Sequence, residues 1–214
     1  DVDVKGITKI TAKDIQYAKE FGYTLKLLGV ARNTDGEMEV GVFPMMIPSG
    51  HPLAHVKDAF NAVFVHGDAV DDAMFQGKGA GEMPTASAVM GDLIAVARNM
   101  QYGCCGRIGC SCYRDLPMKA SGESRHRYFL RLIVEDRTGI LAGVAGVLGN
   151  NNVSINQVIQ KPAVGGVAEL VVITDKVEKR HLKDALVIFG EMSMIREVAS
   201  VIRVYSQRQG DDLL

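Results

Sequence analysis

The C-terminal part of the chain carries an order of apolar patterns that constrains the fold more than any other feature. Strand-like and helix-like runs alternate there, at residues 128–134 (strand), 140–150 (helix), 153–160 (strand), 167–174 (strand), 178–189 (helix) and 198–205 (strand). Leu182, Leu186 and Phe189 recur at helical spacing, whereas the strand-like runs are rich in Val and Ile. This β-α-β-β-α-β order predicts a ferredoxin-like split βαβ domain.

A different set of patterns fills the first 100 residues and predicts a mixed or antiparallel sheet with helices. Thr11 and Gly22 have the residue types expected at the two ends of a short helix, and Asp35-Gly36 is typical of a hairpin turn. The expected strands are residues 24–33, 37–47, 61–70 and 71–81, and Pro84 opens a helix over residues 85–100. The whole chain is therefore expected to be α+β.

The chain divides at a segment with little periodicity. Residues 101–124 hold all the cysteines and several glycines, so we interpret them as a linker between domains at 1–100 and 125–208. The sequence opens with Asp1 inside what reads as the middle of a domain, which suggests a fragment of a longer protein.

The overall charge limits the kinds of partner. With 24 Lys+Arg against 25 Asp+Glu, the formal net charge of -1 gives no field that favours nucleic acid or an anionic membrane. No apolar run approaches the roughly 20 residues of a membrane span. We expect a cytoplasmic protein whose partners are small molecules or other protein chains.

A glycine-rich turn between a strand and a helix is the first candidate site. Gly77, Gly79 and Gly81 resemble a dinucleotide-binding fingerprint, but its last glycine is replaced by Glu82. Backbone amides at such a turn can approach an anion or a planar ring closely. The same residues also suit a tight turn without a ligand, and the pattern alone does not separate the two.

The run from Phe60 to Leu93, with the HPLA segment that begins at His51, resembles the C-terminal part of the homoserine dehydrogenase substrate domain. In that family the GxGAGxxPTA turn lines the NAD(P) cofactor. The resemblance implies cofactor contacts at Gly79, Ala80, Gly81, Pro84 and Thr85. It also implies that the catalytic lysine and aspartate lie before Asp1. Lys5, Lys9 and Lys13 do not match that motif, so no catalytic residue is assigned.

The second candidate site is the loop EDRTGIL, where a strand ends and a helix begins. This loop and the segment that follows are similar to ACT domains, in which they bind a small amino acid at an interface between domains. The resemblance implies a regulatory ligand site, with threonine as the expected ligand, formed by Asp136, Gly139, Ile140, Leu141, Asn152 and Ile155. The alternative is that Asp136 only caps the helix and the domain only dimerises.

Four cysteines within nine residues form a third constellation. Cys104, Cys105, Cys110 and Cys112 lack the C-x-x-C spacing of common zinc and iron–sulfur sites. We favour reduced thiols over a metal site, so no metal is assigned. A metal-binding interaction protein built around these cysteines remains a weaker alternative.

The leading hypothesis is that the chain is part of a homoserine dehydrogenase, which interconverts L-homoserine and L-aspartate 4-semialdehyde with NAD(P) in threonine, methionine and isoleucine biosynthesis. The chain would supply substrate-domain sheet, dimer surface and an ACT sensor, and would be inactive alone without bound cofactor. The alternative is a stand-alone, dimeric, amino-acid-binding ACT protein. The glycine-rich turn favours the enzyme, because a sensor does not need it.

Overall fold

The computed structural model describes residues 2–104 and 115–206, which fall into two compact units. The first, called the sheet unit, consists of Asp1–Ser49 and Leu116–Leu214. The second, called the hairpin unit, is Gly50–Asp115.

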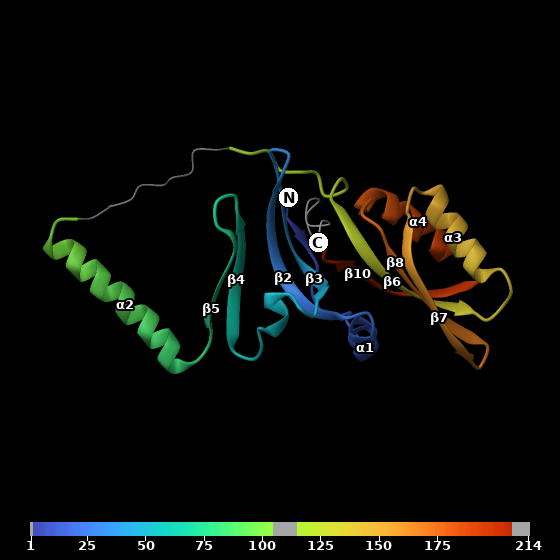
Figure 1. Cartoon of the computed structure of the whole chain (residues 1–214), viewed down its shortest axis with the longest axis horizontal. Helices are drawn as coiled ribbons and strands as arrows, with labels where there is room; N and C mark the ends of the chain where they lie inside the picture. Colours follow the sequence, from blue (N-terminus) through green and yellow to red (C-terminus); the bar gives the residue numbers. More distant parts are fainter. Residues whose placement is uncertain (1, 105–114, 207–214) are drawn as a thin grey trace. The chain divides into compact units, whose positions relative to one another are not determined.

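A mixed sheet forms the body of the sheet unit (Figure 1). Its strands are β1 (Asp3–Val4), β2 (Tyr23–Thr34), β3 (Glu37–Pro48), β6 (Arg125–Glu135), β7 (Ile155–Val164), β8 (Val167–Thr174), β9 (Val177–Glu178) and β10 (Ile195–Val204). The helices of this unit are α1 (Ala12–Glu20), α3 (Ile140–Asn150) and α4 (Lys179–Glu191). The strand order is β1-β3-β10-β6-β8-β7, with β2 paired to β3 and β9 paired to β6.

The predicted ferredoxin-like order is confirmed from β6 onward. The elements follow as β6, α3, β7, β8, α4 and β10, with the short strand β9 added before α4. Within the sheet the first and third of the four main strands, β6 and β8, lie in the middle, between β10 and β7. This central pairing is antiparallel, from Phe129↔Ile173 to Glu135↔Val167.

The N-terminal segment extends the same sheet. Strand β3 pairs in parallel with β10 at Arg203↔Met45 and Val204↔Met46, and β2 pairs antiparallel with β3 along its length. The predicted hairpin turn between β2 and β3 is confirmed, because Asp35 and Gly36 both take positive φ values, 55° and 86°. The sheet is therefore continuous across the boundary near residue 124 that the sequence predicts. The division into domains at 1–100 and 125–208 stays a prediction.

The two faces of the sheet are covered by different helices. Alternate residues of β6, including Leu130, Leu132 and Val134, belong to the core cluster that contains residues of α3 and α4. The intervening residue Phe129 belongs to a second cluster, with Tyr17 and Ala18 of α1. Because side chains alternate along a strand, α1 lies on the face opposite α3 and α4.

Helix α1 is fixed at its start by a capping box. The backbone N–H of Asp14 donates to the Thr11 hydroxyl at 3.3 Å, and the Asp14 carboxylate accepts from the Thr11 backbone N–H at 2.9 Å. Gly22 follows the helix with a φ of 77°, which favours glycine and reverses the chain into β2. Both predicted ends of this helix are confirmed.

The hairpin unit contains the 3₁₀ turn Pro52–His55, the antiparallel strands β4 (Phe60–Gly67) and β5 (Asp71–Lys78), and helix α2 (Glu82–Gln101). Helix α2 begins three residues before the predicted start at residue 85, and Pro84 still lies in its first turn. No residue of α2 is buried, and Ala54 is the only buried residue among those described in this unit.

Met45 and Met46 are buried in β3. His51 accepts a hydrogen bond from the backbone N–H of Leu53 at 3.2 Å and so caps the 3₁₀ turn. Among the helices of the described ranges, none is both long and apolar enough to cross a bilayer.

Candidate functional site

The glycine-rich turn joins β5 to α2. The backbone N–H of Gly79 donates to the Ala59 carbonyl at 3.0 Å, which holds the turn against the segment before β4. Gly81 is the N-cap of α2, with a φ of 119°, and this helix start has no side-chain cap. Helix N-termini without caps leave backbone N–H groups available for an anion or a polar ligand atom.

Gly79 and Gly81 differ in what a side chain would meet. A Cβ atom at Gly79 would overlap the side-chain amide of Asn61, which is exposed and would have to move away. At Gly81 the nearest atom to an added Cβ is Cδ of Pro84 at 3.4 Å, and the backbone conformation is what disfavours a side chain. Ala80 and Thr85 are exposed, and Pro84 is partly exposed, so the predicted cofactor-facing residues lie together on an accessible turn.

The loop after β6 forms the start of α3 without using the Asp136 carboxylate as its cap. Gly139 is the N-cap, in the left-handed conformation with a φ of 85°, and no side chain caps this helix. The backbone N–H of Asp136 donates to the Gly166 carbonyl at 3.1 Å, which ties the loop to the β7–β8 turn. This contradicts the capping role that the alternative gave Asp136, while the other part of that alternative, a domain that only dimerises, stays a prediction.

The six predicted ligand residues fall into two groups. Asp136, Gly139 and the exposed Leu141 surround the start of α3, while Ile140 is 3% exposed and anchors it in the core. Asn152, with a φ of 58°, and Ile155 follow the other end of α3. An 11-residue helix is about 16 Å long, so a single copy does not bring both groups around one small ligand.

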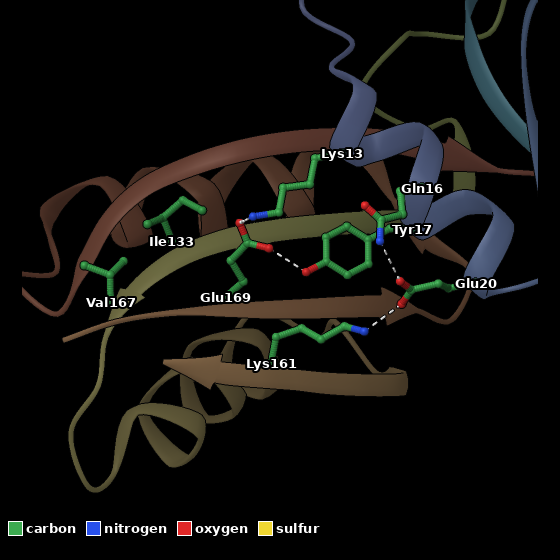
Figure 2. Close-up of a pocket in the computed structure, with 8 residues that line it drawn as sticks. All are labelled: Lys13, Gln16, Tyr17, Glu20, Ile133, Lys161, Val167 and Glu169. Carbon is green, nitrogen blue, oxygen red and sulfur yellow. Dashed lines mark hydrogen bonds and ion pairs between the residues drawn. The ribbon is translucent and has the colours of Figure 1, made fainter. Parts of the chain in front are cut away.

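A cavity of 410 Å³ lies between α1 and the open face of the sheet (Figure 2). Two ion pairs line it: Lys13 Nζ lies 2.5 Å from Glu169 Oε1, and Lys161 Nζ lies 2.8 Å from Glu20 Oε2. The Tyr17 ring stands between these pairs, and Ile133 and Val167 close the other end of the cavity. Gln16 donates to Glu20 at 3.2 Å.

The electrostatics of the cavity centre on Glu169. Its burial alone would raise the carboxyl pKa, but hydrogen bonds from Lys13 and Tyr17 outweigh this and lower the pKa. The Tyr17 hydroxyl donates to Glu169 Oε2 at 2.5 Å. Burial, with the hydrogen bond and charge of Glu169, raises the pKa of the Tyr17 phenol, so this residue remains a donor at neutral pH.

A buried polar network continues from the cavity toward the start of α1. Arg131 Nε donates to Asp14 Oδ1 at 2.9 Å, and the Ser200 hydroxyl donates to the same oxygen at 2.6 Å. Asp14 is fully buried, and its burial alone would raise the carboxyl pKa. Hydrogen bonds from Ser200, Thr11 and Arg131 together lower it. These contacts join α1 to β6 and β10.

Of the predicted cysteine constellation, only Cys104 lies within the described residues, where it is a free thiol. Cys105, Cys110 and Cys112 lie outside the described residues. Within residues 2–104 and 115–206, no three His, Cys, Asp or Glu side chains gather as a metal site.

The sequence interpretation missed the cavity residues. Glu20 and Lys161 are separated by 141 positions, and the sequence names Lys13 only as a residue that does not match the catalytic lysine motif. One pattern was available: Glu169 is the only charged residue in the apolar run of residues 167–174, and a charged residue in such a run often marks a polar contact on the sheet face.

Comparison with known proteins places two families along the chain. Residues 1–94 match the family model described as homoserine dehydrogenase, and residues 128–186 match the ACT domain model. A curated homoserine dehydrogenase of Bacillus subtilis is 38% identical over 206 residues, covering 95% of this chain and 48% of the relative. The homoserine dehydrogenase of Corynebacterium glutamicum is 38% identical over 210 residues, covering 95% and 46%.

Solved structures give the same result. The homoserine dehydrogenase of Thiobacillus denitrificans matches with a TM-score of 0.85 at 32% identity, over 94% of this chain and 47% of that structure. The enzyme of S. aureus at pH 6.0 matches with a TM-score of 0.61 at 26% identity, over 97% and 48%. The chain thus spans about half the length of the relatives that it matches. The predicted resemblance and the predicted α+β fold are confirmed.

Proposed function

We propose that this chain, which matches the homoserine dehydrogenase and ACT domain models in turn, is part of a homoserine dehydrogenase and forms the substrate-domain sheet, the dimer surface and the amino-acid sensor of that enzyme. The proposed activity of the whole enzyme is the NAD(P)-dependent interconversion of L-homoserine and L-aspartate 4-semialdehyde. The proposed regulatory ligand is threonine, bound by the ACT part. The proposed site of action is the cytoplasm.

The observation that carries the sensor assignment is the loop at the start of α3. Its helix start has no side-chain cap, Gly139 takes the left-handed conformation there, and Asp136 is exposed beside it. Backbone N–H groups at such a helix end suit the carboxylate of an amino acid, and the Asp136 carboxylate suits its ammonium group. We propose that two copies pack so that Asn152 and Ile155 of one chain lie near this loop of the other.

The glycine-rich turn suits contact with a cofactor because its backbone is accessible. Gly79, Ala80 and Gly81 present accessible backbone next to the uncapped start of α2, and Thr85 adds an exposed hydroxyl. In the whole enzyme the nicotinamide supplies or accepts the hydride. The residues of this turn would contact the cofactor through the backbone and exclude water from that edge.

We expect no turnover from this chain by itself. By the resemblance, no residue of this chain corresponds to the acid/base lysine or to the substrate-binding aspartate of the family. We also expect assembly into at least a dimer, because the apolar residues Val63 and Phe75 of the hairpin and Leu93 of α2 are all more than half exposed. Exposed apolar surface of this extent is usually covered by another protein surface.

The experiment that tests the sensor is a calorimetric titration of the reduced protein with L-threonine. We expect saturable binding in the wild type and at least tenfold weaker binding in Asp136→Ala, because the ammonium group loses its carboxylate partner. L-serine, L-isoleucine and L-methionine serve as ligand comparisons.

A matched control is Asp175→Ala, which removes an exposed carboxylate that bonds to Asn156 at 3.1 Å, outside the predicted ligand residues. It should leave threonine binding unchanged. If threonine gives neither heat nor a thermal shift, the sensor assignment is wrong and the ACT part serves only in dimerisation.

A further inference from the structure

The cavity beneath α1 already holds two primary ammonium groups on two carboxylates. Lys13 pairs with Glu169, and Lys161 pairs with Glu20 while its Nζ lies 5.6 Å from the centre of the Tyr17 ring (Figure 2). An aromatic ring flanked by carboxylates is a favourable environment for an ammonium ion. The two lysines indicate that this cavity can accommodate a primary ammonium group.

We propose that this cavity binds a small zwitterion carrying a primary ammonium and a carboxylate, at a site separate from the loop before α3. In the bound state the ligand ammonium lies between Glu20 and the Tyr17 ring. The Lys161 amine, released from Glu20, pairs with the ligand carboxylate. The Lys161–Glu20 ion pair is thus replaced by two new ion pairs. Glu20 pairs with the ligand ammonium, and Lys161 pairs with the ligand carboxylate.

Charge balance favours a zwitterion as the ligand. A simple amine that displaced Lys161 from Glu20 would leave the lysine without a counter-ion, and a simple carboxylate that recruited Lys161 would leave Glu20 without one. Because this pair is exposed, the loss of one partner is a modest cost, and charge balance sets a preference for a zwitterion. The side chains of Lys161 and Glu20 are 40% and 34% exposed, so the exchange needs no unfolding of α1.

The apolar end of the cavity limits the ligand side chain. Ile133 and Val167 line it, and both belong to the face of the sheet that α1 covers. Ligand pockets are commonly about 300–1,000 Å³, and a cavity of 410 Å³ lies near the lower limit. A short aliphatic side chain, such as that of valine, matches this space better than an aromatic or charged one.

The test uses the full chain with Ile and Val methyl groups labelled for NMR. Titration with L-valine should shift the methyl signals of Ile133 and Val167 in a saturable manner. Propylamine and propionate at the same concentrations should not do so. In Glu20→Gln/Lys161→Met, which removes both charges of one pair, the apparent Kd for valine should rise at least tenfold.

The control variant is Glu37→Gln/Lys119→Met, which removes a comparable ion pair, 3.5 Å apart, elsewhere in the sheet unit. It should bind valine as the wild type does. Equal shifts with propylamine would overturn the proposal, and so would the absence of saturable shifts in the wild type.

Asp136→Ala separates this inference from the proposed sensor. The cavity proposal predicts that the valine-induced shifts persist in that variant, and their loss would assign them to the loop before α3 and overturn it. Valine shifts at Ile133 and Val167 together with no threonine binding at the loop would support the cavity and contradict only the sensor.

Discussion

The sheet unit and the hairpin unit differ in how their helices are used. In the sheet unit, α1 covers one face of the sheet while α3 and α4 cover the other, and residues such as Phe129 and Leu130 are fully buried. In the hairpin unit, α2 is longer than any helix of the sheet unit, yet none of its residues is buried. Amphipathic periodicity therefore specifies a helix without specifying the surface that covers it.

The largest expected effect tests this difference in burial. Phe129→Ala should lower the free energy of unfolding by about 3–5 kcal/mol, because it empties space in the core under α1. Leu93→Ala in α2, where the side chain is 57% exposed in a single copy, should change it by no more than about 0.5 kcal/mol at protein concentrations low enough to keep the chain monomeric. Urea unfolding followed by circular dichroism measures both. A loss of several kcal/mol in Leu93→Ala would show that a second surface covers α2 in solution.

The next effect tests the polar attachment of α1. Arg131→Met should cost about 3 kcal/mol, because it leaves the buried Asp14 carboxylate without its charged partner. Hydrogen exchange should then show faster exchange of the α1 amides than of the α3 amides. The control Arg137→Met breaks an exposed pair with Glu135 and should cost at most about 1 kcal/mol. Equal losses in both variants would mean that the buried network has no special role.

Acid should destabilise the sheet unit through its buried carboxylates. Burial would raise the pKa of Glu39, but the hydrogen bond from His126 outweighs it and lowers this pKa, as the network around Asp14 does for that residue. A carboxyl group with a lowered pKa in the folded state stabilises the fold above its unfolded pKa of about 4. This contribution is lost as the pH falls through the folded pKa.

Urea unfolding across pH 7 to 3 measures this dependence. Below about pH 4 each such group should contribute a slope of up to about 1.4 kcal/mol per pH unit. Glu39→Gln should flatten the curve relative to the wild type. A curve of unchanged steepness would show that this carboxyl titrates alike in the folded and unfolded states.

The smallest effect compares the two helix starts. Thr11→Ala should cost about 1 kcal/mol, because it removes the hydroxyl of the α1 capping box. Glu82→Gln in the first turn of α2, which has no side-chain cap, should change stability by only a few tenths of a kcal/mol. Thermal unfolding of the two variants provides the measurement, and the ranking would be contradicted if Glu82→Gln were the more destabilising.

Local features of the fold were predictable from the sequence because local chemistry determines them. The capping residue Thr11, the Asp35-Gly36 turn and the strand–helix order after residue 125 each depend on residues close together in the chain. The parallel pairing of β3 with β10 was not predictable in this way, since no local pattern specifies which distant strand an edge will meet.

The candidate sites were predictable to different degrees. The turn at Gly79–Gly81 and the loop at Asp136–Gly139 are contiguous, so a resemblance could identify their residues, although their ligands remain proposals. The cavity depends on Tyr17 and Glu169, whose side chains meet from positions 152 apart. Such a contact arises only after α1 has packed on the sheet, and a single sequence carries no record of it.

The joining of β3 to β10 has a consequence for folding during synthesis. The Asp14–Ser200 hydrogen bond closes a loop of 186 positions, and the β3–β10 pairing closes one of similar length. Residues 2–49 leave the ribosome long before β10 is synthesised. Until then, the edge of β3 that pairs with β10 and one face of α1 remain exposed. High contact order of this kind slows folding and favours chaperone binding to the waiting segment.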